Sequence, residues 1–198
     1  MKVRTTILAS LLAMASTVAS ADNDTVVDFE DTPALHFPIG IGGKSVAVVP
    51  AFEDYAFMMF DACDAMELSK EDCMIYPMNA ALGGNAIATI LDGNRVIVYD
   101  RELSPIVGST GAMAIIAHEL GHHYCGHIGT PVDPMQELEA DRIAGATLRN
   151  EGVSLEGALS VTELLERRPS RSHPEKAARV AAMTDGWNDP EAAKNCRR

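Results

Sequence analysis

The sequence predicts an α+β fold, formed by a single domain over residues 22–198 with its core at about 45–185. Two observations indicate this class. Short apolar runs typical of strands are concentrated in the first half of the chain. Longer segments with apolar residues at helical spacing dominate the second half. Strands that precede the helices, instead of alternating with them, favour a small sheet packed against several helices.

The expected strands include one hairpin. We predict a strand at residues 45–49 (SVAVV) and a β-hairpin made of residues 85–91 (NAIATIL) and 95–100 (RVIVYD). Between the last two runs stands Asp92-Gly93-Asn94, a strong tight-turn signal. Residues 73–78 (CMIYPM) are a candidate for a further strand, whereas residues 22–44 are expected to be an irregular lead-in with one short strand.

The expected helices are recognised by apolar spacing and by their ends. Residues 52–68 carry Met and Phe at helical spacing, which indicates a face packed in the core. The histidine-rich helix can be capped by Ser109 or Thr110, and Pro134 suits the first turn of the helix that follows. The predicted helical segments are residues 52–68, 109–127, 134–149, 154–167 and 174–184.

Residues 1–21 have the pattern of a secretory signal peptide. A basic start is followed by an apolar run from Ile7 to Val18 and by Ala19-Ser20-Ala21, a small-x-small cleavage site. A membrane anchor is the alternative, but the apolar run is short and contains Ser and Thr. We therefore expect cleavage before Asp22, export to the periplasm or the medium, and no stable membrane insertion.

The charge of the chain excludes some partners. The formal net charge is −12 at pH 7. An acidic surface repels nucleic-acid phosphates and anionic lipids, so we expect neither as a partner. The sequence makes no prediction about the oligomeric state.

The chain has four cysteines, at positions 63, 73, 125 and 196. An even number in an exported chain favours two disulfides, which can be paired in three ways. We favour Cys63–Cys73, which closes a short loop, and Cys125–Cys196, which would tie the C-terminal tail to the histidine-rich helix. A cysteine zinc site is the alternative, but the chain contains no CxxC pair.

The segment HELGHHYCGH, residues 118–127, indicates a metal site. His118 and His122 are four residues apart and therefore share one face of a helix. Glu119 lies about 100° round the helix from His118, where a carboxylate can reach a water at the metal. Two ligands and a general base in this order form the HExxH arrangement. A metal-free histidine pair is the alternative, but its burial in an apolar run needs compensation.

The residues that follow this motif do not complete the site. His123 lies about 140° and His127 about 180° round the helix from His118, so neither faces the same ion. We expect His123 at the surface or beside a ligand, and His127 capping or packing at the helix end. The zinc-peptidase pattern HExxHxxGxxH is excluded, because Cys125 and Ile128 stand where Gly and His are required.

A carboxylate on the next helix can supply the third ligand that a catalytic zinc ion needs. Glu137 and Asp141 are four residues apart and share a face, whereas Glu139 lies about 200° from Glu137 and points elsewhere. We predict Glu137 as the third ligand and Asp141 as the acceptor for the free N–H of a ligand imidazole. The alternative is an acidic helix start stabilised by the helix dipole.

These motifs resemble those of the HtpX-like and CAAX-prenyl-protease-like gluzincin zinc metallopeptidases. The resemblance implies one Zn²⁺ ion per chain, bound by the two histidines and Glu137, with Glu119 as general base. Many members carry membrane helices around the catalytic domain, which we do not expect here after the signal peptide. The matching motifs are HELGH at 118–122 with the trailing His127, ELEAD at 137–141, NAIA at 85–88 and SHPEKAARVAAM at 172–183.

The resemblance also implies roles outside the metal ligands. Asn85, Ala86, Ile87 and Ala88 would begin an edge strand that pairs with an extended substrate. His173 would be a catalytic residue that stabilises the oxyanion, or else only a helix-start residue before Pro174. Arg179 would pair with carboxylates near the site.

The predicted function is hydrolysis of peptide bonds in exported or envelope proteins by a zinc endopeptidase. Zinc would activate a water molecule, and Glu119 would take its proton and pass it to the leaving amine. The alternative is a catalytically idle or latent zinc protein that binds polypeptides along its edge strand in a chaperone or assembly role. A zinc hydrolase acting on a non-peptide bond lacks a supporting motif.

Overall fold

The computed structural model describes residues 35–39, 44–51, 54–131, 133–164 and 173–197. They belong to one compact unit, Ala34–Arg198. The predicted signal peptide, residues 1–21, lies outside the described residues. Among the described residues, no helix is both long enough and apolar enough to cross a bilayer.

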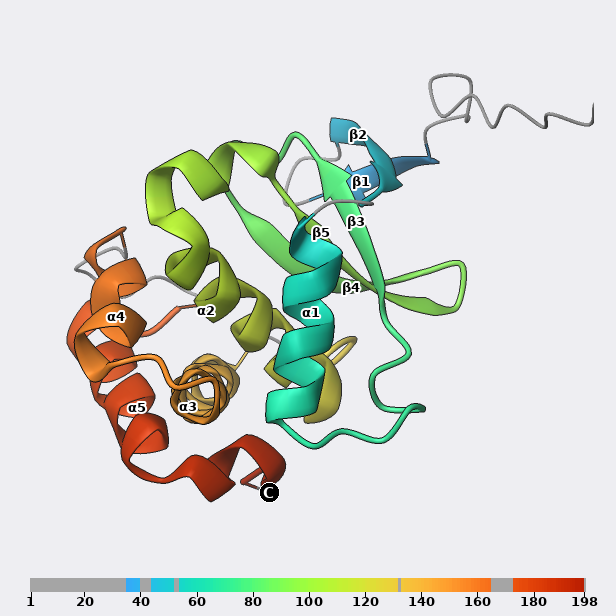
Figure 1. Ribbon diagram of the computed structural model, residues 1–198. Helices are drawn as coiled ribbons and strands as arrows, with labels where there is room; N and C mark the ends of the chain where they lie inside the picture. The colour runs from blue at the N-terminus through green and yellow to red at the C-terminus, as the bar shows by residue number, and fades with distance from the viewer. Residues whose placement is uncertain (1–34, 40–43, 52–53, 132, 165–172, 198) are drawn as a thin grey trace, which may run out of the picture. The chain divides into compact units, whose positions relative to one another are not determined.

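The structure is α+β, as predicted, with one five-stranded sheet in the order β1-β2-β3-β5-β4 (Figure 1). Strands β3 and β5 are parallel, and the other neighbours are antiparallel. Among the described strands, β4 therefore lies at one edge. The strands are β1 (Leu35–Ile39), β2 (Lys44–Pro50), β3 (Tyr76–Ala80), β4 (Ala86–Leu91) and β5 (Asn94–Tyr99).

The predicted hairpin is confirmed as β4 and β5. Its turn shows why the pairing could be predicted from neighbouring residues alone. Asp92 and Gly93 have φ angles of 45° and 81°. Two successive residues with positive φ give the turn whose twist matches antiparallel strands, and Asp-Gly adopts it readily. The candidate strand at residues 73–78 is shifted to Tyr76–Ala80.

The helices follow the predicted order, with changed boundaries. Within the described residues, three short 3-10 helices accompany them: η1 (Arg101–Leu103), η2 (Ser160–Leu164) and η3 (Pro190–Lys194). Helix α4 is shorter than the predicted helix over residues 154–167 and continues as η2; residues 165–167 lie outside the described part. The five α-helices are α1 (Asp54–Ala65), α2 (Ser104–Tyr124), α3 (Pro134–Asn150), α4 (Leu155–Leu159) and α5 (Lys176–Asn188).

The histidine-rich helix predicted over residues 109–127 is the second piece of a longer helix, α2, and it ends at Tyr124. Helix α2 begins at Ser104, and Ser109 and Thr110 lie inside it. Gly108, at φ 66° and ψ −179°, interrupts the helical backbone and divides α2 into two pieces. A proline in the first turn begins the first piece. The predicted start at residue 109 lies directly after this interruption, whereas the first piece was not predicted.

Helix α2 lies between the sheet and the other helices. Helix α2 contacts β4, α1 and α3, and α3 in turn packs along α5. Figure 1 shows α2 and α3 in the middle of the helical part. Side chains of these elements fill the interior: Met59, Tyr99, Ile116, Leu120 and Ile143 are all less than 2% exposed. The helix with the HExxH motif is thus held from several sides, which fixes the direction of its histidines.

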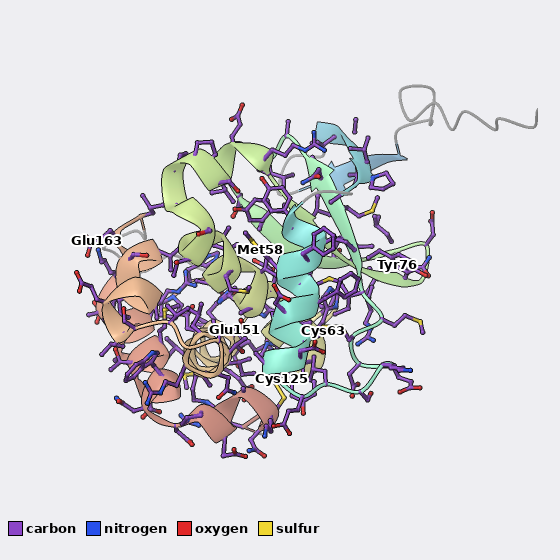
Figure 2. The ribbon with its side chains drawn as sticks, viewed as in Figure 1. Met58, Cys63, Tyr76, Cys125, Glu151 and Glu163 are labelled. Carbon is purple, nitrogen blue, oxygen red and sulfur yellow. A yellow bond between two sulfur atoms is a disulfide. The ribbon has the colours of Figure 1, made fainter. Side chains whose placement is uncertain are left out.

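The favoured disulfide pairing is confirmed. Cys63 of α1 is bonded to Cys73 in the segment before β3, and their Cα atoms are 5.9 Å apart (Figure 2). Cys125, the residue directly after α2, is bonded to Cys196 in the C-terminal tail, at a Cα separation of 5.5 Å. The second bond joins the end of the histidine-rich helix to the last residues of the chain.

Candidate metal centre

Two neighbouring helices bring three donor side chains to one point. His118 and His122 come from consecutive turns of α2, and Glu137 comes from the first turn of α3. The two Nε2 atoms are 3.1 Å apart. Each lies 3.5 Å from a carboxylate oxygen of Glu137. The spacing along the chain placed the histidines on one face; the packing of α2 on α3 adds the carboxylate.

These donors fit a zinc ion. Ligand bonds of 2.0–2.1 Å in a tetrahedron hold the donor atoms about 3.4 Å from one another, close to the separations seen here. The Oε2 atom of Glu137 is buried and has no hydrogen-bond partner among the described residues. A buried carboxylate oxygen without a partner is costly, and a cation between the three side chains would satisfy it. Two imidazoles with one carboxylate are also a donor set of catalytic zinc sites.

In the metal-free chain the three donors form a charged pair and a neutral imidazole. Burial lowers the pKa of His118, but the hydrogen bond to Asp141 and the nearby carboxylate of Glu137 outweigh it and raise this pKa to about 10. Burial raises the pKa of Glu137, but the neighbouring imidazole of His118 and its charge outweigh it and lower this pKa to about 2. Burial, reinforced by the charge of His118, lowers the pKa of His122 to about 3. A divalent ion that displaces the proton of His118 would raise the net charge of these groups by one.

Asp141 and Arg179 hold the first histidine. The Nδ1 atom of His118 lies 2.9 Å from Oδ1 of Asp141, which is 1% exposed. Arg179 of α5 donates two hydrogen bonds to the same carboxylate, of 2.7 and 2.8 Å. Burial raises the pKa of Asp141, but Arg179 and His118 outweigh it and keep the pKa below its ordinary value. An ionised Asp141 fixes the ring of His118 with Nε2 toward the other donors.

Glu119 lies in the same cleft, against the edge strand. Its Oε2 atom accepts a 2.6 Å hydrogen bond from the backbone N–H of Ala88 in β4. Burial raises the pKa of Glu119 above its ordinary value. A cleft of about 630 Å³ brings these groups together. Its lining includes Asn85, Ala86, Ile87, Ala88, His118, Glu119, His122, Glu137, Asp141 and His173.

A comparison with protein families agrees with this geometry. Residues 56–133 match the model of peptidase family M48. This segment belongs to peptidase family M48. It runs from within α1 to the residue before α3 and contains His118, Glu119 and His122, in agreement with the resemblance predicted from the motifs. M48 metallopeptidases depend on a metal, typically zinc, so the match supports a metallopeptidase function in general. No curated protein and no solved structure matches the chain.

Beyond the M48 segment, the structure adds His173 at the mouth of the cleft. Its Nε2 atom lies 3.6 Å from Oε2 of Glu137, and its side chain is 53% exposed. The residue precedes α5, which begins at Lys176. Both alternatives considered for His173, an oxyanion donor and a helix-start residue, are compatible with this place, and its catalytic role stays a prediction.

The expectation for His123 was wrong. Its side chain is 7% exposed, and its Nε2–H donates a 2.8 Å hydrogen bond to the carbonyl of Val96 in β5. It contacts the sheet and not a metal ligand. The helical angle of about 140° from His118 defines the direction of His123, but only the packing of α2 on the sheet brings that direction to β5.

The role of Glu139 was missed from the sequence. His127 packs at the end of α2, as expected, with its Nδ1 3.0 Å from Nδ1 of His122. Its Nε2 lies 3.1 Å from Oε2 of Glu139. Glu139 does point away from Glu137, but toward His127. Cys125, His127 and Glu139 lie close enough to hold an ion. The disulfide, however, leaves Cys125 without the thiolate that binds metals.

Proposed function

We propose that this chain is a zinc endopeptidase that hydrolyses peptide bonds of exported or envelope proteins. The M48 segment supports a metallopeptidase, and the donor set of His118, His122 and Glu137 supports zinc. The observation that carries the proposal is the position of Glu119, whose carboxylate shares one cleft with these donors and with an edge strand.

The side chains of this cleft divide the chemistry between them. Zinc held by the two histidines and Glu137 would act as a Lewis acid toward a water molecule and toward the scissile carbonyl. Glu119 accepts the proton of the attacking water and delivers it to the leaving amine. Burial raises the pKa of Glu119, which makes its carboxylate a stronger base than a solvated one. His173, at the mouth of the cleft, would donate to the oxyanion.

The edge strand supports an extended polypeptide as substrate. The carbonyl of Asn85 accepts from the N–H of Asp100, so the backbone of Asn85 faces the β5 side. Because backbone groups alternate along a strand, those of Ala86, Ala88 and Ile90 face away from β5. The N–H of Ala88 reaches Glu119, which confirms this direction. A peptide that adds to this edge would bind by main-chain hydrogen bonds and lie along the donors.

Export is part of the proposal. Residues 1–21 have the composition of a signal peptide. The two disulfides are typical of proteins that fold in an oxidising compartment. The N-terminal sequence of the protein recovered from a periplasmic or extracellular fraction would test this: it should begin at Asp22. Recovery only from the cytoplasm, with Met1 retained, would contradict export.

The activity is tested on unfolded casein with zinc, with fragments followed by mass spectrometry. Glu119→Gln should retain one zinc ion per chain and lose cleavage by a factor of about 100 or more, the size of effect expected for loss of a general base. Glu156→Gln, an exposed carboxylate of α4, is the matched control and should cleave like the parent.

Two outcomes would count against the enzyme. Cleavage by Glu119→Gln at the rate of the parent would exclude this residue as the base. Stoichiometric zinc with no cleavage of unfolded proteins by the parent would favour the alternative, a zinc protein that binds polypeptides along β4 without hydrolysing them.

A further inference from the structure

The two histidine donors are held in different ways. His118 is fixed directly by the carboxylate of Asp141, 2.9 Å from its Nδ1. The Nδ1 atom of His122 instead faces a second imidazole, that of His127, at 3.0 Å. Metal-binding imidazoles usually pass their free N–H to an acceptor, which sets the tautomer and the ring orientation. The acceptor for His122 is therefore the imidazole of His127, whose own tautomer and orientation must be fixed by a further partner.

The protons of this chain can be arranged in one way when His122 binds a metal. Its Nε2 faces the other donors, so Nδ1 carries the hydrogen and donates to Nδ1 of His127. A neutral His127 then carries its own hydrogen on Nε2, which donates to Oε2 of Glu139 at 3.1 Å. The series ends on a carboxylate, as it does for His118, but with one imidazole inserted.

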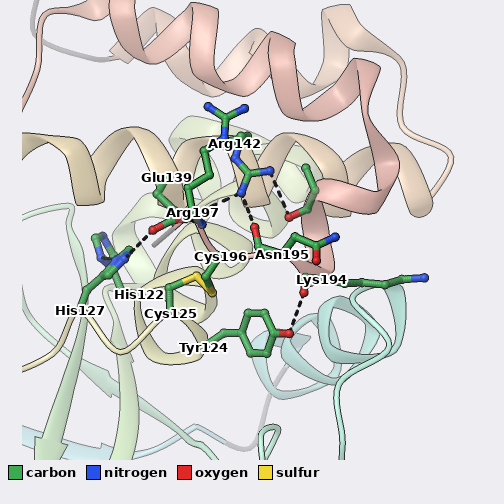
Figure 3. Close-up of a disulfide and its surroundings, with 11 residues drawn as sticks. His122, Tyr124, Cys125, His127, Glu139, Arg142, Lys194, Asn195, Cys196 and Arg197 are labelled. Atoms are coloured by element: carbon green, nitrogen blue, oxygen red, sulfur yellow. Dashed lines mark hydrogen bonds and ion pairs between the residues drawn. A yellow bond between two sulfur atoms is a disulfide. The ribbon is translucent and has the colours of Figure 1, made fainter.

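The C-terminal tail holds Glu139. Its second oxygen, Oε1, accepts a hydrogen bond from the backbone N–H of Arg197. Glu139 and Arg197 are 58 positions apart in the chain, so only the folded tail brings them together. The guanidinium of Arg142 lies 3.8 Å from the same oxygen. Figure 3 shows this arrangement around Glu139.

The Cys125–Cys196 bond fixes the last residues of the tail. Upstream of Cys196, the tail is already attached: Ala192 and Ala193 are buried, and Tyr124 donates a 2.9 Å hydrogen bond to the carbonyl of Lys194. Downstream, the exposed side chain of Arg197 pairs with Asp185 at 2.9 Å. The disulfide is the covalent constraint next to the N–H that reaches Glu139 (Figure 3).

We propose that the disulfide-locked C-terminal tail positions the metal ligand His122, through Glu139 and His127. The inference rests on the proposed metal site, and it assigns His127 and Glu139 as positioning residues. Cys125 follows His122 by three positions, so the same bond also anchors the end of the ligand helix. One covalent link thus restrains both ends of the hydrogen-bond series.

The test measures zinc affinity by competition with a chromogenic chelator, so it does not depend on peptidase activity. Glu139→Gln should weaken zinc binding by about 10-fold or more, as is typical for hydrogen-bond partners of metal ligands. The amide oxygen of the introduced Gln can accept from His127, but its NH₂ group then faces the N–H of Arg197. Two donors cannot bond to each other, so the hydrogen bond to the tail is lost. The matched control is Glu191→Gln in the same tail, whose side chain is 73% exposed; it should bind zinc like the parent.

The disulfide is tested with a matched pair. Cys125→Ser/Cys196→Ser should weaken zinc binding by about 10-fold, whereas Cys63→Ser/Cys73→Ser removes the other disulfide and should not. Combining the first pair with Glu139→Gln should add little, because both changes break the same series. The visible spectrum of the cobalt-substituted protein should shift in the Glu139 variant and remain unchanged in the Glu191 control. A loss of stability alone would not change the spectrum of the folded protein.

The outcomes separate this inference from the proposed function. A parent that binds no zinc overturns both. A parent that binds zinc, with folded Glu139→Gln and Cys125→Ser/Cys196→Ser proteins within about twofold of its affinity, overturns the positioning role alone. If the serine variant does not fold, Glu139→Gln decides, since it leaves both disulfides intact.

Discussion

The backbone N–H of Ala88 donates a 2.6 Å hydrogen bond to Oε2 of Glu119. The bond joins the edge strand β4 to the carboxylate that the HExxH motif predicts as the general base. The place where a substrate strand would add and the group that would move the proton are therefore coupled through one backbone amide.

This coupling predicts the effect of Ala88→Pro. Proline removes the N–H that reaches Glu119, and no bond to β5 is lost because that N–H faces away from β5. We expect kcat/KM on a fluorogenic peptide to fall about 10-fold or more, the equivalent of a hydrogen bond to a charged group. Zinc content should not change. Ala88→Gly keeps the N–H and is the control; equal activity in the two variants would contradict the coupling.

The buried pair of Asp141 and Arg179 predicts a double effect of Asp141→Asn. The variant should bind zinc about 10- to 100-fold more weakly, because the amide holds His118 less firmly. It should also unfold more easily, by about 3 kcal/mol in the metal-free state, because Arg179 keeps a buried charge without its counter-ion. Zinc titration and urea denaturation measure the two effects. Glu163→Gln, which breaks the exposed pair with Lys176, should change neither.

The crossing of α3 and α5 predicts that Gly186 tolerates no side chain. A Cβ atom added there would lie 1.7 Å from the carbonyl oxygen of Arg142. The backbones must separate to admit it, so Gly186→Ala should lower the free energy of unfolding by about 3 kcal/mol. Gly157→Ala, whose added Cβ meets only side chains at 3.1 Å or more, is the control. Similar urea midpoints for the two variants would show that the helices can move apart without loss.

Asp100 predicts a pH-dependent contribution to stability. Its carboxylate accepts from the backbone N–H groups of Leu82, Gly84 and Glu102 and so holds the segment that leads into β4. Burial raises its pKa, but these N–H groups outweigh it and hold the pKa below the ordinary value of 3.8. Asp100→Asn should therefore cost about 1–3 kcal/mol at neutral pH.

The sign of the pH effect follows from linkage. Because the folded-state pKa of Asp100 is lowered, its contribution is present above the unfolded pKa and is lost as pH falls through the folded one. The difference in urea stability between the parent and Asp100→Asn should be full at pH 6 and should shrink below about pH 3.8. A difference that stays constant down to the acid transition would contradict the role of the charge. Asp61→Asn, on the exposed face of α1, is the control.

The features that could be predicted from the sequence depend on local geometry. His118 and His122 share a helix face because four residues make about one turn, and the same spacing relates Glu137 to Asp141. The hairpin turn at Asp92-Gly93 follows from residues that accept a positive φ. In each case the covalent chain itself fixes the relation between residues that are close in sequence.

Other predictions failed where a local signal had two interpretations. The predicted start at Ser109 follows the break at Gly108, but the piece before that glycine, which begins at Ser104, was not predicted. The direction of His123 was calculated correctly relative to His118. Which element occupies that direction depends on how α2 packs on the sheet, and there it meets the carbonyl of Val96.

The sequence by itself determined the fold class, the order of strands and helices and the HExxH spacing, whereas it only favoured one of three possible disulfide pairings. Only the tertiary structure decided that α3 brings Glu137 to the histidines, that β4 reaches Glu119, and that the tail reaches Glu139. The reason is physical: local periodicity relates residues a few positions apart, whereas contacts such as Glu139 with Arg197 exist only when buried surfaces dock. The proposed active site is therefore encoded in short motifs but assembled by the packing of α2, α3, β4 and the tail.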